Sequence, residues 1–554
     1  PAMKGQKSPT IGTKDFSHPL RAIDDFDETI DDFALASIAL SLKAISLNPS
    51  LLQSYGASDR LLFSASDYLD LSKSKTMTAL QGLLADKEAR TLMSMFLLAS
   101  AKKNLSMCSF RLFDVQKPKE KKVWSTRVTE KDRENAVKDE FGVKYSKDWK
   151  RLLKAPNELE GEYSVREGVY VIGEFAFYDC DSLTSIIIPK GVTNIGSSAF
   201  SDCDSLTSIN IPNSVTSIGG GAFSGCKSLT SINIPNSVTN IEISAFVECY
   251  SLTSIIIPNS VTNIGINAFA ECYSLTSIII PNSVASIESC AFYDCSSLAK
   301  ISISKSVTSI GSSAFYGCYS LKNITIPSGV VDIIGNPFCG WHGELHNESK
   351  NFIYEDQVLF SKDRTTIIAY RAKETNYIIP DSVTTIGERA FASCYYMTSI
   401  IIPKSVTTIG EGAFAGCSMT SIAIPDSVTT IGESAFFECT SLISIDISNS
   451  VTSLGGSAFG LCTSLRNIAI PDSVTTIGES AFYECTSLIG INIPDSVTTI
   501  GKGAFEGCNS LTDINIPTSV TTIEKFAFGG CYKIPYKIKS DIIQRFGEEV
   551  FESL

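Results

Sequence analysis

The sequence has very few of the side chains that usually carry out catalysis. Only three of its 554 residues are histidines, His18, His342 and His346. It contains no phosphate-binding loop, no GxSxG nucleophile motif and no dinucleotide fingerprint. Cys108 would have only His18 as a base in its part of the protein, and His18 lies in a tail that we expect to be disordered. We therefore predict no catalytic residue, no cofactor and no enzymatic activity.

Long apolar runs are also missing, so no transmembrane helix is predicted. Residues 1–18 include basic side chains but no apolar core, unlike a secretory signal. Pro1-Ala2 resembles a cloning remnant, which would make Met3 the native start and the protein cytoplasmic. A trimmed signal would instead allow a cell-surface or secreted protein. Acidic residues outnumber basic residues, and the formal net charge is −13. Nucleic acid, which is itself negatively charged, is therefore not the expected partner.

What the sequence does contain is one unit repeated many times. The phenylalanine of an Ala-Phe pair recurs every 23 residues in two runs separated by an interruption, with a single step of 22 after Phe414 in the second run. Pro337-Phe338 keeps the same spacing as a degenerate extra copy. The repeated phenylalanines are Phe177, Phe200, Phe223, Phe246, Phe269, Phe292 and Phe315, then Phe391, Phe414, Phe436, Phe459, Phe482, Phe505 and Phe528.

Each unit predicts one coil of a solenoid. SLTSIxIP alternates apolar and polar residues, which is typical of a short strand with one buried face. A turn follows at Pro and Asn, Asp or Ser, SVTxIG reads as a second extended piece, and AFxxC closes the coil. A single coil cannot bury its apolar side, but stacked coils share a continuous core.

These residues resemble the BspA-like leucine-rich repeats, whose pattern is IGxxAFxxCxxLxxIxIPxSVTxIG. The resemblance covers roughly residues 142–554. It implies a mostly β repeat solenoid, a curved right-handed stack of coils, which here would carry a small α-helical N-terminal domain. It also implies a bacterial or protozoan surface protein that binds host proteins, although other members have no known role.

The cysteines follow the repeat, which favours packing over chemistry. All of the 17 cysteines except Cys108, Cys290 and Cys339 lie three residues after the repeated phenylalanine. A metal site needs ligands that converge on one point. A translated cysteine forms a line along the stack, and free cysteine is a small residue that is often buried. We therefore predict reduced, structural thiols, which weakly favours a reducing compartment.

Breaks in the repeat divide the protein. Residues 1–18 are predicted to be a disordered tail, and 19–141 an α-helical domain with a charged linker. VKYSKDWKRLLKAP and VLFSKDRTTIIAYR share a strand, S-K-D turn, strand pattern, so each predicts a β-hairpin that opens a block of repeats. The predicted solenoid parts are a capping hairpin at 142–170, a first block at 171–338, a degenerate repeat with an inserted hairpin at 339–380, a second block at 381–535, and a C-terminal capping helix at 536–554 that starts near Ser540.

One short segment contains metal-ligand residue types. CGWHGELH holds Cys339, His342, Glu344 and His346. On a strand, the two histidines and the glutamate would share one face, which could hold a metal. The alternative, which we favour, is a degenerate repeat strand with Leu345 facing the core. We therefore assign no metal.

A binding surface is the remaining candidate for function. The outward positions of the predicted concave strand sheet are small, polar or aliphatic, whereas specific interfaces usually centre on Tyr, Trp or Arg. Tyrosines occur instead directly after the repeated Phe or Cys. The predicted binding residues are Tyr250, Tyr273, Tyr293, Tyr316, Tyr319 and Tyr395. A solvated edge without a partner is an equally good interpretation.

The leading functional hypothesis is a non-catalytic protein-interaction scaffold. The solenoid would recognise a protein partner, and the helical domain would dock or act as an effector. One alternative is a cell-surface adhesin for host extracellular proteins. Another is an effector or enzyme whose activity resides in the helical domain.

Overall fold

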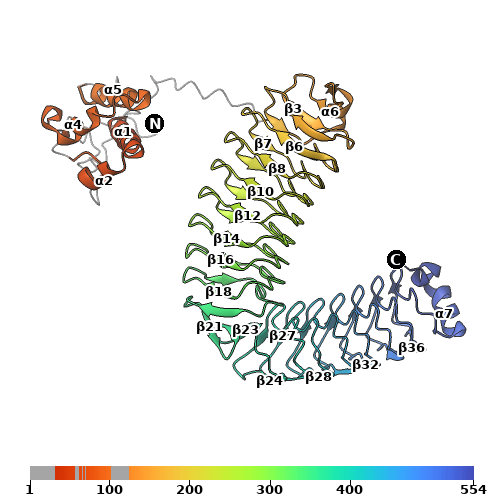
Figure 1. The fold of residues 1–554 in the computed structure, drawn as a ribbon. Helices are drawn as coiled ribbons and strands as arrows, with labels where there is room; N and C mark the ends of the chain where they lie inside the picture. The colour runs from red at the N-terminus through yellow and green to blue at the C-terminus, as the bar shows by residue number, and fades with distance from the viewer. Residues whose placement is uncertain (1–31, 57–60, 65–66, 69, 102–123, 554) are drawn as a thin grey trace, which may run out of the picture. The chain divides into compact units, whose positions relative to one another are not determined.

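The structure, a computed structural model, describes residues 32–56, 61–64, 67–68, 70–101 and 124–553 (Figure 1). The protein divides into two compact units, Pro1–Val123 and Trp124–Leu554. The predicted tail at 1–18 and Cys108 lie outside the described residues. Within these residues, no helix is both long and apolar enough to cross a bilayer.

The first unit is helical. Its apolar residues, among them Leu40, Phe63, Met77 and Phe96, form a separate core. The rings of Phe63 and Phe96 stack with centroids 4.8 Å apart. The helical elements of this unit are α1 (Asp32–Leu47), α2 (Ser50–Tyr55), η1 (Leu71–Lys73), α4 (Lys75–Gln81) and α5 (Lys87–Ala101).

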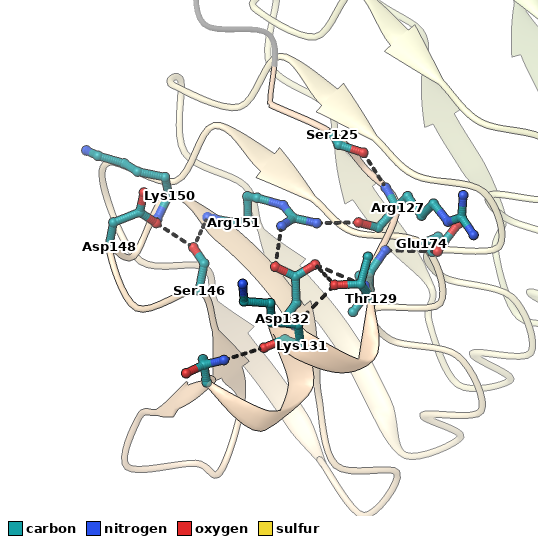
Figure 2. A network of polar contacts seen from close by, with 12 residues as sticks. Ser125, Arg127, Thr129, Lys131, Asp132, Ser146, Asp148, Lys150, Arg151 and Glu174 are labelled. Carbon is teal, nitrogen blue, oxygen red and sulfur yellow. Dashed lines mark hydrogen bonds and ion pairs between the residues drawn. The ribbon is translucent and has the colours of Figure 1, made fainter.

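The second unit begins at Trp124, earlier than the predicted boundary at 141. Thr129 and Asp132 form a capping box at the start of helix α6 (Glu130–Glu134). However, this helix is tied to the solenoid (Figure 2), because Asp132 accepts a hydrogen bond from Arg151 at 2.9 Å. The backbone N–H of Val128 also donates to the Glu174 carboxylate at 2.9 Å. Residues 124–134 are therefore part of the solenoid's edge, not of the helical unit.

The repeats form stacked coils, each with a longer and a shorter strand. Strands of successive coils pair in parallel with residues in register, so that Ser231 lies beside Ser254 and Asn233 beside Ile256. A 23-residue step moves each position to the same place on the next coil. This finding confirms the predicted solenoid with a small helical region before it.

Two rows of strands run along the stack. The longer strands are β4 (Gly161–Ser164), β6 (Leu183–Ile187), β8 (Ser208–Asn210), β10 (Ser231–Asn233), β12 (Ser254–Ile256), β14 (Ser277–Ile279), β16 (Lys300–Ser302), β18 (Asn323–Ile326), β20 (Glu344–Asn347), β24 (Asn376–Ile378), β26 (Ser399–Ile401), β28 (Ser421–Ala423), β30 (Ser444–Asp446), β32 (Asn467–Ala469), β34 (Gly490–Asn492) and β36 (Asp513–Asn515). The shorter strands are β5 (Val171–Ile172), β7 (Asn194–Ile195), β9 (Ser217–Ile218), β11 (Asn240–Ile241), β13 (Asn263–Ile264), β15 (Ser286–Ile287), β17 (Ser309–Ile310), β19 (Asp332–Ile333), β25 (Thr385–Ile386), β27 (Thr408–Ile409), β29 (Thr430–Ile431), β31 (Ser453–Leu454), β33 (Thr476–Ile477), β35 (Thr499–Ile500) and β37 (Thr522–Ile523).

The core of the solenoid is built from identical residues of successive coils. The repeated phenylalanines are fully buried and stack face to face, for example Phe223 on Phe246 with centroids 5.5 Å apart and ring planes 6° from parallel. The isoleucines of the strands, the cysteines of the turns and the repeated Val, Leu and Ala of each coil complete it. Inside each block, the thiol of the repeat donates a hydrogen bond to the phenylalanine carbonyl of the preceding coil, as Cys272 does to Phe246 at 3.2 Å. In the first coil of each block the acceptor is another residue, Pro156 for Cys180 and Tyr370 for Cys394.

Each block of repeats begins with an antiparallel hairpin. Strands β2 (Lys144–Tyr145) and β3 (Arg151–Lys154) follow the edge strand β1 (Val137–Lys138), and β3 pairs in parallel with β5. Strands β21 (Phe352–Glu355), β22 (Val358–Ser361) and β23 (Thr366–Tyr370) repeat this plan, with β23 beside β25. In both S-K-D turns the serine hydroxyl donates to the aspartate at 2.7 Å.

The second hairpin separates the two cores. Leu359 and Ile368 belong to the core of the first block, whereas Phe360 and Ile367 belong to the core of the second. Successive strand residues point to opposite faces, so both faces of this hairpin are buried. The hairpin thus closes one block and opens the next.

The C-terminal segment covers the last coil. Helix α7 (Tyr536–Phe546) is followed by η4 (Glu548–Phe551). The helix begins at Tyr536, not near Ser540, because Pro535 keeps an extended backbone and the backbone turns helical immediately after it. Arg545 donates to the carbonyls of Ile516 and Pro517, each at 2.9 Å, and Phe528 N–H donates to Val550. These bonds satisfy backbone groups that no further coil would pair.

Candidate binding surface

The turns that close each coil present side chains to solvent. Two positions per turn, just before the Ala and just before the Cys, adopt left-handed backbone angles, as Asn267 (φ 54°) and Glu271 (φ 60°) do. Glycine is frequent at these positions because it adopts left-handed angles without a steric penalty, and Ser, Glu and Asp occupy most of the others. The residues after Phe and after Cys are thereby held in the same orientation in every coil, which places tyrosines at these positions in rows.

The predicted tyrosines form two stacks. Tyr250 and Tyr273 lie with ring centroids 4.9 Å apart, and their hydroxyls donate to Glu248 at 3.0 Å and to Glu271 at 2.7 Å. Tyr293 and Tyr316 lie closer, with centroids 4.6 Å apart and planes 9° from parallel. These pairs fix the rings in a definite orientation, so little side-chain entropy would be lost if a partner covered them.

The junction between the two blocks adds further tyrosines. Tyr319 is 70% exposed and Tyr395 is 56% exposed. Burial, followed by the nearby phenols of Tyr293 and Tyr395, raises the pKa of Tyr316, which shows that residues far apart in sequence lie near one another. Sequence reasoning missed Tyr396, which is also 56% exposed.

The contacts that bring these tyrosines together cross from one block to the other. The Asn336 amide donates to the Arg389 carbonyl at 3.0 Å, and the Cys339 thiol lies 3.9 Å from the Ala392 carbonyl. The last coil of the first block therefore lies against the first coil of the second. We name Tyr250, Tyr273, Tyr293, Tyr316, Tyr319 and Tyr395 the tyrosine face.

The row of longer strands offers a second, less distinctive surface. Ile256 is 76% exposed and Ile279 is 71% exposed. They line a shallow groove of ≈ 710 Å³ with Asn259 and Asn282 on its rim. The groove has no charged or aromatic lining residue, in keeping with the predicted absence of an interface anchor on these strands.

The four candidate metal ligands do not converge. Glu344 and His346 lie on the exposed face of β20, with their side chains 3.6 Å apart, whereas the Cys339 thiol is buried against the second block. Burial and the charges of Lys373 and Arg371 lower the pKa of His342. Leu345 is 4% exposed and β20 pairs in register with β18, as a degenerate repeat strand should. Within the described part of the protein, no group of three or more His, Cys, Asp or Glu side chains could hold a metal ion.

The thiols of the repeat have the chemistry of packing residues. Burial raises the pKa of Cys180 to about 11 and that of Cys318 to about 12, and it raises the pKa of Cys226, Cys249 and Cys272 further. A reactive cysteine needs a thiolate at neutral pH. These thiols stay protonated and act as hydrogen-bond donors.

The repeat sequence decides the identification. The protein matches the family described as "BspA type Leucine rich repeat region (6 copies)" over residues 161–273, 239–347, 369–489 and 475–554, which is more than half of its length. The chain belongs to the BspA-type leucine-rich repeat family. Leucine-rich repeat solenoids generally act in protein binding or adhesion, and the family is generally non-enzymatic.

Solved leucine-rich repeat proteins resemble this BspA-type protein. A leucine rich cell surface protein from Faecalibacterium prausnitzii is 30% identical over 69% of this chain and 94% of its own, with a TM-score of 0.44. A leucine rich repeat protein of T. pallidum is 31% identical over 37% of this chain and 98% of its own, with a TM-score of 0.34. A leucine-rich repeat protein from Bacteroides ovatus is 28% identical over 76% of this chain and 96% of its own, with a TM-score of 0.28. Comparison with curated proteins found no match.

Proposed function

We propose that this protein is a non-catalytic interaction scaffold that recognises a protein partner through the tyrosine face. The observation that carries the proposal is the clustering of exposed and stacked tyrosines at the block junction, where Tyr319, Tyr395 and Tyr396 are each more than half exposed. Tyrosine is enriched at protein interfaces because it combines a large apolar ring with a hydroxyl that can hydrogen-bond. The helical unit serves as a docking or effector module.

The same proposal includes the compartment: the protein acts where thiols stay reduced. The buried cysteines of the described solenoid are free thiols, and their S–H groups donate to backbone carbonyls along the stack. Oxidation would remove these donors. Such a thiol-rich core is typical of proteins that stay reduced.

A capture experiment with the full-length protein tests the tyrosine face. Wild-type protein and the double variant Tyr319→Ser, Tyr395→Ser would serve as baits for the source cell's lysate and for host extracellular proteins. We expect a saturable partner from the lysate, bound about tenfold or more weakly by the double variant because exposed aromatic anchors dominate interfaces. The matched control is Tyr532→Ser, Tyr536→Ser, which removes two tyrosines that are 85% and 86% exposed but lie at the C-terminal end of the solenoid, in the last turn and at the start of helix α7.

Each outcome discriminates between the functional hypotheses. A partner that binds wild type and the double variant equally well would place recognition outside the tyrosine face. A partner found only among extracellular proteins would favour the adhesin. Loss of binding in the control variant as well would show that surface tyrosines act non-specifically and would contradict the proposal.

A further inference from the structure

The junction between the blocks contains an arginine whose charge is not balanced. The guanidinium of Arg371 donates to the carbonyls of Trp341 at 2.9 Å and of Gly343 at 2.6 Å. It lies 4.3 Å from the centre of the Trp341 ring. Among the described residues no carboxylate forms an ion pair with it.

Partial burial makes this charge costly. Burial lowers the pKa of Arg371, and the nearby Tyr354 phenol raises it by a smaller amount. Buried charges in proteins are normally paired with a charge of opposite sign. Two carbonyl dipoles and a ring face offset only part of the cost, so the site favours a bound anion.

A small pocket adjoins the guanidinium. It has a volume of ≈ 30 Å³, and its lining residues include Arg371, Trp341, Lys373, His342, Tyr370 and Tyr396. Lys373 and His342 are exposed at its rim, whereas Trp341 and Tyr370 are buried. None of the lining residues is acidic, in a protein whose net charge is −13. The pocket therefore concentrates positive charge on a mostly negative molecule.

We propose that this junction pocket binds a single carboxylate group presented by the protein partner. A volume of this size admits a group of a few atoms and no larger ring or sugar. Both terminal nitrogens of Arg371 already donate to carbonyls, so a carboxylate would be held chiefly by the charge of the guanidinium, and Lys373 adds a second cation at the rim. Tyr396 joins the pocket to the tyrosine face, so the inference rests on the proposed function and specifies an acidic residue or a C-terminal carboxylate of the partner as the contact.

Small dicarboxylates test the pocket without any partner. Binding of glutarate to the full-length protein would be followed by ligand-observed NMR, with the neutral isostere glutaramide as the chemical control. We expect weak saturable binding of glutarate and none of glutaramide. Lys373→Glu should weaken glutarate binding about tenfold or more because it sets a like charge beside the ligand. The matched control Lys362→Glu reverses an exposed charge in the neighbouring S-K-D turn and should bind as the wild type does.

The remaining outcomes would overturn the inference. These are equal binding of glutaramide, unchanged binding by Lys373→Glu, or no saturable binding of glutarate to wild-type protein. His342→Ala supplies a second rim variant, since this exposed residue can be truncated without disturbing the core. Four peptides, with a C-terminal acid or amide and with or without one internal glutamate, would then separate the two sources of the carboxylate. Failure here leaves the capture experiment unaffected, because that experiment changes only tyrosines.

Discussion

At the residue scale, the recurring cysteine belongs to a reactive residue type but serves here in packing and hydrogen bonding. A thiol in the turn of one coil donates to a carbonyl of the coil before it, and burial keeps it protonated. Sequence spacing alone indicates a line of thiols, because a 23-residue period repeats the same place on every coil. It does not indicate the acceptor, which belongs to the phenylalanine of the preceding coil.

The raised thiol pKa values predict lower stability at alkaline pH. The folded-state pKa lies above 9.0, so these thiols favour folding below pH 9, and this contribution is lost as the pH rises and the unfolded protein releases protons. Each thiol that stays protonated when folded should cost about 1.4 kcal/mol per pH unit above the unfolded pKa. Urea unfolding at a series of pH values from neutral to alkaline would measure the loss. The double variant Cys226→Ala, Cys272→Ala should show a shallower decline, and an equal decline would contradict the assignment to thiols.

At the element scale, the inserted hairpin is the part of the fold with the most particular sequence requirement. Its residues alternate between two cores, so neighbouring side chains stabilise different blocks. The S-K-D turn could be recognised from the sequence because serine and aspartate hydrogen-bond locally. The burial of both faces of the hairpin could not be recognised from the sequence, because it depends on coils that lie far away in the sequence.

Two neighbouring substitutions in this hairpin should act on different blocks. Leu359→Ala removes a fully buried side chain from the first core, and Phe360→Ala removes one that is 3% exposed from the second. We expect each to destabilise its own block by about 2–5 kcal/mol, because a buried cavity remains. Hydrogen exchange on the two blocks would show the difference. Equal loss of protection in both blocks after either change would contradict the division of the cores.

The sequence and the structure differ most where contacts are non-local. The capping box and charges of helix α6 favour a place in the helical domain, yet Arg151 and Glu174 of the solenoid hold residues 128–132 in place. The tyrosine rows were predictable from the repeat period. The pocket at Arg371 was not, because it forms where the coils resume stacking after an interruption.

At the scale of the whole molecule, three separate cores should give separable unfolding. The helical unit, the first block and the second block each have their own group of buried residues. Solenoid stability is a sum of coil stabilities and interfaces between neighbouring coils. Phe436→Ala should lower the unfolding temperature of the second block, and Phe246→Ala that of the first, each at a cost of about 3–5 kcal/mol. Calorimetry with both variants would check this, and one shared transition that moves equally in both would contradict it.

The two-faced hairpin also has a consequence for the order in which the protein forms during synthesis. A polypeptide that leaves the ribosome N-terminus first completes the first block and then the strands β22 and β23, whose Leu359 and Ile368 close that block. The opposite faces, with Phe360 and Ile367, wait for the second block to be made. The same hairpin therefore first caps the finished block and then provides the first strands on which the second block stacks. A polypeptide truncated after residue 380 and released from the ribosome should therefore already protect its first block from protease, whereas one truncated after residue 351 should leave the end of that block open to cleavage.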